Sequence, residues 1–165
     1  MNTILQHIIA AHQDNWPEEF DPMALPFALA FHRSHGLMYG RACAAMATFE
    51  LTPAEFDVLA SLRRSPAPHA LTPSQLRQAL LITSGGLTKV LHQLTARGLV
   101  ERPPGVGDRR VKPVRLAEPA YPLIDRAMRE VMQVTRQRLL KFLSGEEIRD
   151  LTELLAKLAA DEQED

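Results

Sequence analysis

The chain has 165 residues, 45% of them hydrophobic and 24% charged, which fits one globular domain with accessory helices and excludes a large two-domain enzyme or a disordered chain. Its formal net charge of −1 hides a segregation, because residues 63–115 carry ten Lys or Arg and two Asp or Glu, a local charge of +8. The single cysteine, Cys43, excludes an intramolecular disulfide, and the absence of a recognisable membrane span or secretory signal predicts a cytoplasmic protein without a membrane partner.

Two helices are expected in the first 50 residues. Residues 3–15 carry apolar side chains at helical spacing, and a break at residues 15–17 ends the pattern. A second helix begins within residues 21–26, where two prolines blur the boundary, and continues to about Thr48. Its apolar content predicts that this helix is long and mostly buried.

The clearest helix starts are two capping boxes, in which an N-cap side chain and the side chain three residues later each bond the other's backbone N–H. Thr52 with Glu55 forms the first, and Thr72 with Gln75 forms the second. In both, proline occupies the first helical position, where its missing N–H costs nothing. Two helices are therefore expected to begin here.

The third helix of this region opens at residues 82–83 and stops at Gly98. Its apolar residues follow an i, i+3, i+4, i+7 pattern that predicts a buried face: Leu87, Val90, Leu91 and Leu94. Residues 99–102 and 110–116 then predict the two strands of a hairpin, whose tip between them is rich in glycine, proline and arginine.

Two further helices are expected after the hairpin. One follows Pro119 and continues towards Phe142. Another capping box, Ser144 with Glu147, starts the last helix. The chain then ends in a short acidic tail at residues 161–165.

Helix, short turn, helix and hairpin, all within the +8 segment, is the order of a winged helix-turn-helix. Concentrated positive charge is typical of proteins that neutralise phosphates. Opposite its buried face, the third helix displays groups that can donate to phosphates or read base edges: Ser84, Gly86, Lys89, His92 and Gln93. In the hairpin tip, Arg109 and Arg110 can reach a minor groove, and Asp108 can orient one of them. Double-stranded DNA is therefore the predicted partner.

Four stretches carry a resemblance to a known family. They are residues 51–59, the helix that begins at Thr72, residues 83–98, and the triplet Asp108, Arg109, Arg110. Together they resemble the multiple antibiotic resistance regulator (MarR) family of winged-helix transcription factors. The resemblance implies a mostly helical fold with a small β-hairpin wing, flanked by N- and C-terminal dimerisation helices.

The family layout implies three regions and a homodimer. Residues 1–50 would contribute to dimerisation and to a ligand pocket, residues 51–117 would form the winged helix-turn-helix, and residues 118–165 would form C-terminal dimerisation helices. The predicted terminal helices also carry more apolar residues than so small a core needs, which agrees with a subunit interface: Ile4, Ile8, Ile148, Leu151, Leu155 and Leu158. Pro113 departs from the commoner family pattern, and we expect the second wing strand to be short or at an edge because proline removes a ladder donor.

The resemblance also implies which residues contact DNA. The major groove would be contacted by Ser84, Gly86, Thr88, Lys89, His92 and Gln93, and the DNA backbone by Thr72 and Ser74. In the wing, Arg110 would enter the minor groove, and the further DNA-binding residues would be Asp108, Arg109 and Lys112.

Members of the family commonly hold a small anionic or aromatic ligand between the dimer helices and the DNA-binding lobe, and the ligand shifts the two recognition helices. The extra first helix resembles the urate-responsive branch, to whose ligand residues Trp16, Asp57 and Arg102 correspond. The arginine that this branch carries in its recognition helix is Val90 here. Without that donor fork, an aromatic or phenolic effector is expected in place of urate. Core packing is the alternative interpretation of Trp16.

Three other interpretations compete with a ligand-responsive repressor. Cys43 could be a redox-sensing thiol, although its alanine-rich surroundings predict a buried and inert one. His32 and His35 could share a metal, but no acidic residue or cysteine lies nearby in the sequence, which favours a surface or ligand-pocket pair. A winged helix for protein interaction is the third, and the +8 segment argues against it. No catalytic or cofactor-binding motif is present, so we expect no enzyme, no cofactor and no metal.

Overall fold

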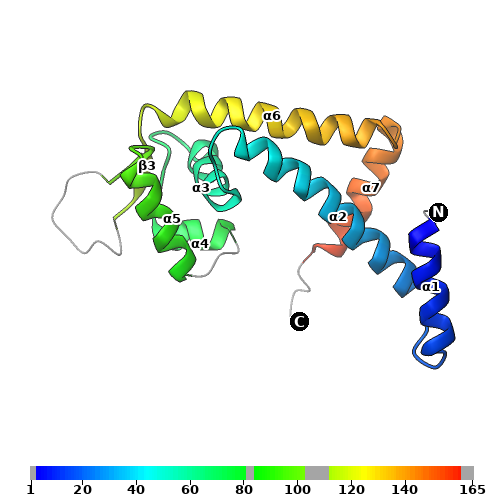
Figure 1. Ribbon diagram of the computed structural model, residues 1–165. Coiled ribbons are helices and arrows are strands. Elements are labelled where there is room, and N and C mark those ends of the chain that lie inside the picture. Colours follow the sequence, from blue (N-terminus) through cyan, green and yellow to red (C-terminus); the bar gives the residue numbers. More distant parts are fainter. Residues whose placement is uncertain (1–2, 81–83, 103–111, 161–165) are drawn as a thin grey trace. The chain divides into compact units, whose positions relative to one another are not determined.

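The computed structural model describes residues 3–80, 84–102 and 112–160, and it is mostly helical with a small sheet (Figure 1). Its elements are α1 (Thr3–Asn15), α2 (Ala24–Ala47), α3 (Pro53–Arg64), β1 (Ala70–Leu71), α4 (Pro73–Leu80), α5 (Ser84–Ala96), β2 (Val100–Glu101), β3 (Val114–Leu116), α6 (Ala120–Leu140) and α7 (Gly145–Leu158). The chain forms two compact units, Met1–Arg41 and Ala42–Asp165, and each is described by itself. None of the described helices is long and apolar enough to cross a membrane.

Capping side chains explain where several helices begin. The side chain of Thr52 accepts a hydrogen bond from the backbone N–H of Glu55, whose carboxylate accepts one from the backbone N–H of Thr52, as predicted. Ser144 and Glu147 repeat this arrangement at α7. At α2, the carboxylate of Asp21 accepts from two backbone N–H groups, at 2.7 and 2.9 Å, which lowers its pKa. Each cap satisfies N–H groups that have no partner within the helix.

The sheet has three antiparallel strands in the order β1-β3-β2. Val100 pairs with Leu116 in β3, which confirms the hairpin, but Ala70 pairs with Arg115 on the other side, so the prediction of two strands misses β1. The second wing strand was expected to be short or at an edge, and it is short: β3 lies at the centre of the sheet but begins directly after Pro113, where no ladder N–H is lost.

The core of the larger unit surrounds α3, and α4, α5, the sheet and α6 pack against it (Figure 1). Its largest fully buried side chains include Leu59 and Leu62 from α3, Leu76 from α4, Leu94 from α5 and Ile124 from α6. The predicted face of α5 is buried at all four positions: Leu87, Val90, Leu91 and Leu94. Two residues after the end of this helix, Gly98 has a φ of 67°, a left-handed conformation that suits glycine and turns the chain into β2.

The expectation that the second helix is mostly buried is wrong for the single chain. Only Ala45 and Met46 of α2 are buried, and Cys43 is partly exposed, against the expectation of a buried thiol. Large apolar side chains are exposed on both terminal pairs of helices, among them Ile4, Ile8, Phe27, Phe31, Leu140, Leu151, Leu154 and Leu158. Burial within the single chain therefore accounts for the apolar residues of α3 to α5 and of the core-facing side of α6, but the other large apolar side chains of the terminal helices stay exposed.

Candidate nucleic-acid interface

The α5 helix is amphipathic in the way a DNA-reading helix requires. Its leucine-rich side is buried against the core, which leaves a polar side with the exposed residues Gly85, Thr88, Lys89, His92 and Gln93, beside a half-buried Gly86. The Ser84 side chain lies outside the described residues. Of the predicted major-groove residues, those that the structure describes thus lie together on one helix side.

The start of α4 adds a second polar group. The backbone N–H of Thr72 donates to the side-chain oxygen of Gln75 at 2.8 Å, and the Thr72 hydroxyl accepts from the backbone N–H of Gln75 at 3.3 Å, so the second capping box is confirmed. Ser74 is exposed and accepts a hydrogen bond from Arg77 at 3.3 Å. The first N–H groups of a helix carry a partial positive charge, which attracts anions to this helix start.

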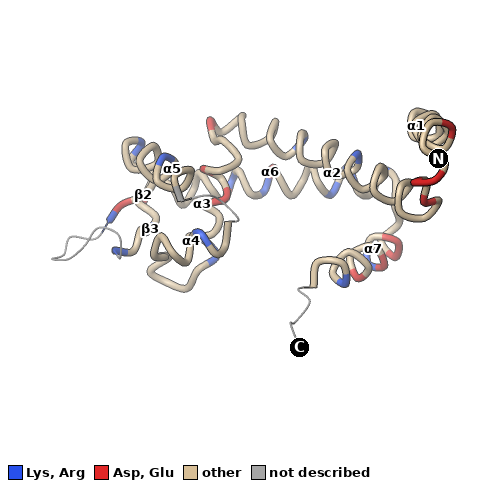
Figure 2. The backbone as a smooth tube through the Cα atoms, turned by 90° about the horizontal axis from the view of Figure 1, so that it is seen from below, with Lys and Arg blue, Asp and Glu red and all other residues tan. Residues whose placement is uncertain are grey.

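The wing is described only at its base. Asp108, Arg109 and Arg110 lie outside the described residues, whereas Lys112 is half-buried just before β3. At the base, the guanidinium of Arg115 donates to the carboxylate of Glu101 at 2.7 Å, an exposed ion pair between β3 and β2. Figure 2 shows basic positions on α4 and α5, in contrast to the many acidic positions of α7.

One ion pair near the polar side of α5 was not predicted from the sequence. Arg97, directly after α5, donates to the carboxylate of Glu55 in α3 at 2.9 Å, and Glu55 is only 4% exposed. Burial acts to raise the pKa of Glu55, but hydrogen bonds from Thr52 and Arg97 outweigh it and the pKa is lowered. The capping box identified Glu55 in the sequence, but nothing local links it to a partner 42 residues away.

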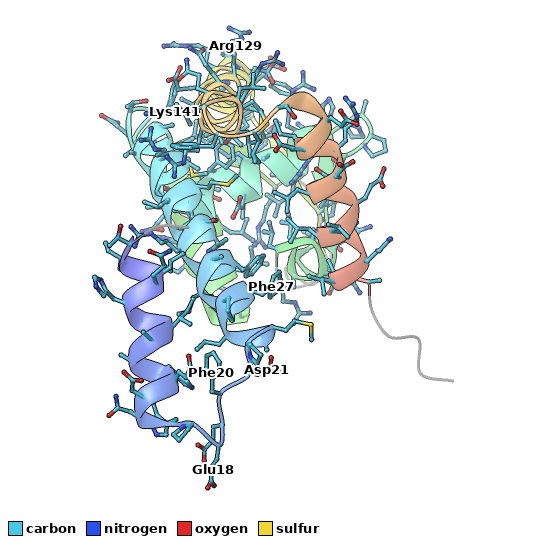
Figure 3. The ribbon with its side chains drawn as sticks, turned by 90° about the vertical axis from the view of Figure 1, so that its right-hand side faces the viewer. Glu18, Phe20, Asp21, Phe27, Arg129 and Lys141 are labelled. Carbon is cyan, nitrogen blue, oxygen red and sulfur yellow. The ribbon has the colours of Figure 1, made fainter. Side chains whose placement is uncertain are left out.

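The candidate ligand residues of the smaller unit are accessible. Trp16 is 56% exposed in the single chain, so core packing is wrong for it, and its ring lies 5.1 Å from that of His12. His32 and His35 are exposed, and the His35 ring stacks on Tyr39 at 5.6 Å. No cluster within residues 3–80, 84–102 and 112–160 could hold a metal. Figure 3 shows Glu18, Phe20 and Asp21 in the link between α1 and α2, and Phe27 on α2.

The other two ligand candidates belong to the larger unit. Arg102 is exposed directly after β2, and Asp57 lies on the outer side of α3. Desolvation by surrounding protein atoms raises the pKa of the Asp57 carboxyl, and the positive charge of Arg64 only partly opposes it. A carboxyl with a raised pKa is a recurrent feature of functional sites.

Replacing Asp57 with asparagine should therefore alter the pH dependence of stability. The folded state holds the Asp57 proton more tightly than the unfolded state, so the wild type loses stability as the pH rises through the folded pKa of this group. The asparagine variant lacks this loss, and its stability relative to the wild type should increase from about pH 3.5 to pH 6. Urea denaturation across this range checks it, and a constant difference between the two proteins would contradict it.

Comparison with known proteins supports the resemblance to the MarR family. A MarR family model matches residues 49–111. The HTH-type transcriptional regulator PecS of Dickeya dadantii (strain 3937) is 39% identical over 110 residues, which are 67% of this chain and 66%, just under two thirds, of PecS.

Solved structures extend the similarity to the flanking helices. A mutant MarR from E. coli complexed with operator DNA has a TM-score of 0.70 and 28% identity, over 82% of this chain and 94% of that chain. A MarR family protein of Mycobacterium tuberculosis in complex with p-aminosalicylic acid has a TM-score of 0.63 and 26% identity, over 85% and 100% of the two chains. Since a family model, a relative and the fold of nearly whole solved chains agree, the chain belongs to the MarR family of winged-helix transcriptional regulators.

Proposed function

We propose that this protein is a homodimeric repressor that binds operator DNA and is released from it by a small aromatic or phenolic ligand. The observation that carries the proposal is the polar outer side of α5, mounted on a buried leucine face within the +8 segment. The complex of E. coli MarR with operator DNA supports it, because that chain shares this fold at 28% identity.

The exposed residues of α5 divide by chemistry into two roles. Lys89 carries a positive charge that suits a phosphate, which contributes affinity for any sequence. Gln93 can bond an adenine edge through both groups of its amide, and His92 can donate to a guanine, which contributes specificity. Thr72 and Ser74 at the start of α4 would contact the DNA backbone, with Arg110 of the wing in the minor groove.

An aromatic effector fits the accessible aromatic residues of the smaller unit. Within this unit, Trp16 and the histidines His32 and His35 offer ring faces and ring N–H groups to such a ligand. The p-aminosalicylic acid complex of the M. tuberculosis relative shows that a family member binds a molecule of this class. A ligand causes release of the DNA only if the ligand binds more tightly to the protein conformation that cannot bind DNA.

The test compares a fluorescent duplex of the DNA upstream of the protein's own gene with a random duplex, at several salt concentrations. We expect Lys89→Ala to weaken binding to both duplexes and to reduce the salt slope by about two, because each subunit of the dimer loses one phosphate contact. Gln93→Ala should instead cost about 1 to 3 kcal/mol per subunit, and on the upstream duplex alone.

Lys157→Ala on α7 is the matched control, since it removes an exposed cation outside the +8 segment. If it weakens binding as much as Lys89→Ala, then α5 does not contact DNA. Salicylate and urate are added in separate titrations. Release by salicylate supports an aromatic effector, and release by urate alone would contradict the expectation drawn from Val90.

A further inference from the structure

We propose that the ion pair between Glu55 and Arg97 positions α5 for sequence reading: it fixes the end of this helix, and with it the start of the wing, on α3. The inference rests on the proposed DNA-binding function, because it names residues that determine specificity without contacting DNA. Both are therefore positioning residues. The carboxylate of Glu55 is nearly inaccessible, so a direct contact with DNA is not available to it.

The Glu55 carboxylate is held in place by its own helix. One oxygen accepts hydrogen bonds from the backbone N–H and the hydroxyl of Thr52, at 2.9 and 2.8 Å. The other accepts from Arg97 at 2.9 Å. Each oxygen thus serves a different element, and the α3 cap sets the carboxylate at a fixed point for the arginine. A charge-assisted hydrogen bond to a fixed acceptor is directional.

Arg97 lies where the chain leaves α5 for the sheet. Its backbone N–H still donates to Gln93, at 3.1 Å, and Gly98 follows with its left-handed φ. The N–H of Leu99 then donates back to Leu94 at 2.9 Å, and the carbonyl of Leu99 accepts from Ala117 at 3.1 Å. A bond at this junction therefore restrains both the last turn of α5 and the first residues that lead to β2.

Hydrophobic packing alone gives weaker control over this junction. The leucine face of α5 is held against α3 by non-directional contacts, which tolerate small rotations and slides of the helix. Base reading requires hydrogen-bond geometry within a few tenths of an ångström. The Glu55–Arg97 pair supplies the missing restraint, and in the described part of the chain it is the ion pair that joins α3 to α5.

The other two ion pairs of the described residues differ in location and in the exposure of their carboxylate. Arg63–Asp125 joins α3 to α6, and Arg115–Glu101 lies within the sheet. Their carboxylate side chains are 47% and 49% exposed, against 6% for Glu55, whereas all three arginines are similarly exposed, at 34% to 40%. Exposed pairs restrain their elements little, because water and salt screen them. Arg63–Asp125 is therefore a suitable reference: it also begins on α3, but its carboxylate is solvated and its partner helix does not read DNA.

Glu55→Gln and Asp125→Asn form the matched test, since each removes one negative charge and keeps the side-chain shape. Charge alone predicts that both bind every DNA slightly more tightly, because the protein becomes more positive. Positioning predicts the opposite for Glu55→Gln on the upstream duplex, roughly a tenfold weaker affinity, the equivalent of one base contact, with the random duplex unaffected or bound more tightly. Arg97→Lys, which keeps the charge and a donor, should lose less discrimination than Arg97→Gln.

Binding is measured well below the melting temperature of each variant, so that all are folded. If Glu55→Gln keeps the wild-type ratio of upstream to random affinity, the positioning role is wrong, even if the melting temperature falls. If the wild type itself does not prefer the upstream duplex, the proposed function fails. The restraint by the Glu55–Arg97 pair is then tested separately, by amide hydrogen exchange at Gly98 and Leu99. Faster exchange in Glu55→Gln than in Asp125→Asn supports the restraint, and equal exchange overturns it.

Discussion

Replacing Leu94 with alanine is expected to destabilise the larger unit by about 3 to 4 kcal/mol, the largest effect of a single truncation in α5. Leu94 is fully buried between α5 and α3, so its loss removes apolar contacts and leaves a cavity that the surrounding helices cannot fill. The same contacts hold the proposed DNA-reading side of α5 in position. We therefore expect DNA affinity to fall with stability. Urea denaturation followed by circular dichroism measures the free energy of unfolding.

Gln93→Ala is the control for this measurement. It truncates the neighbouring residue of the same helix, but Gln93 is exposed, so stability should change by no more than about 0.5 kcal/mol. If the two variants were equally stable, α5 would not be packed on α3 as the structure shows.

Replacing Leu154 with aspartate is expected to convert a dimer into monomers. Leu154 is 57% exposed in the single chain and shares one side of α7 with Leu151 and Leu158, which are 41% and 66% exposed. Surfaces of this kind on terminal helices are typical of subunit interfaces. In a two-fold dimer each substitution acts twice, and two carboxylates without partners in an apolar interface are strongly unfavourable. Sedimentation equilibrium would show the loss.

Ala156→Asp introduces the same charge on the side of α7 that faces away from Leu151, Leu154 and Leu158, where the residue is exposed. This variant should remain dimeric. If Leu154→Asp also sediments as a dimer, α7 does not form the interface, and the apolar surface of the terminal helices needs another explanation.

The helix starts could be predicted from sequence because their causes are local. Thr52 with Glu55, Thr72 with Gln75, and Ser144 with Glu147 each satisfy one another's backbone within three residues, so the pattern is complete in four letters. The buried face of α5 could also be predicted from the sequence, because the helical spacing of its apolar residues coincides with burial at all four predicted positions.

What escaped prediction depends on distant partners. The strand β1 has two residues, and only its pairing with β3, more than forty residues later, makes it a strand. The partner of Glu55 is distant for the same reason. The burial of α2 was overestimated because apolar content does not tell whether a helix is covered by its own chain or by another copy.

The three capping boxes share one backbone geometry but differ in charge. Those of α3 and α7 are closed by a carboxylate, from Glu55 and Glu147, whereas the box of α4 is closed by the neutral amide of Gln75. A carboxylate would cancel the partial positive charge of the helix start, and an amide leaves it in place. The start of α4 is thus as firmly capped as the others and yet remains electrostatically attractive to an incoming phosphate.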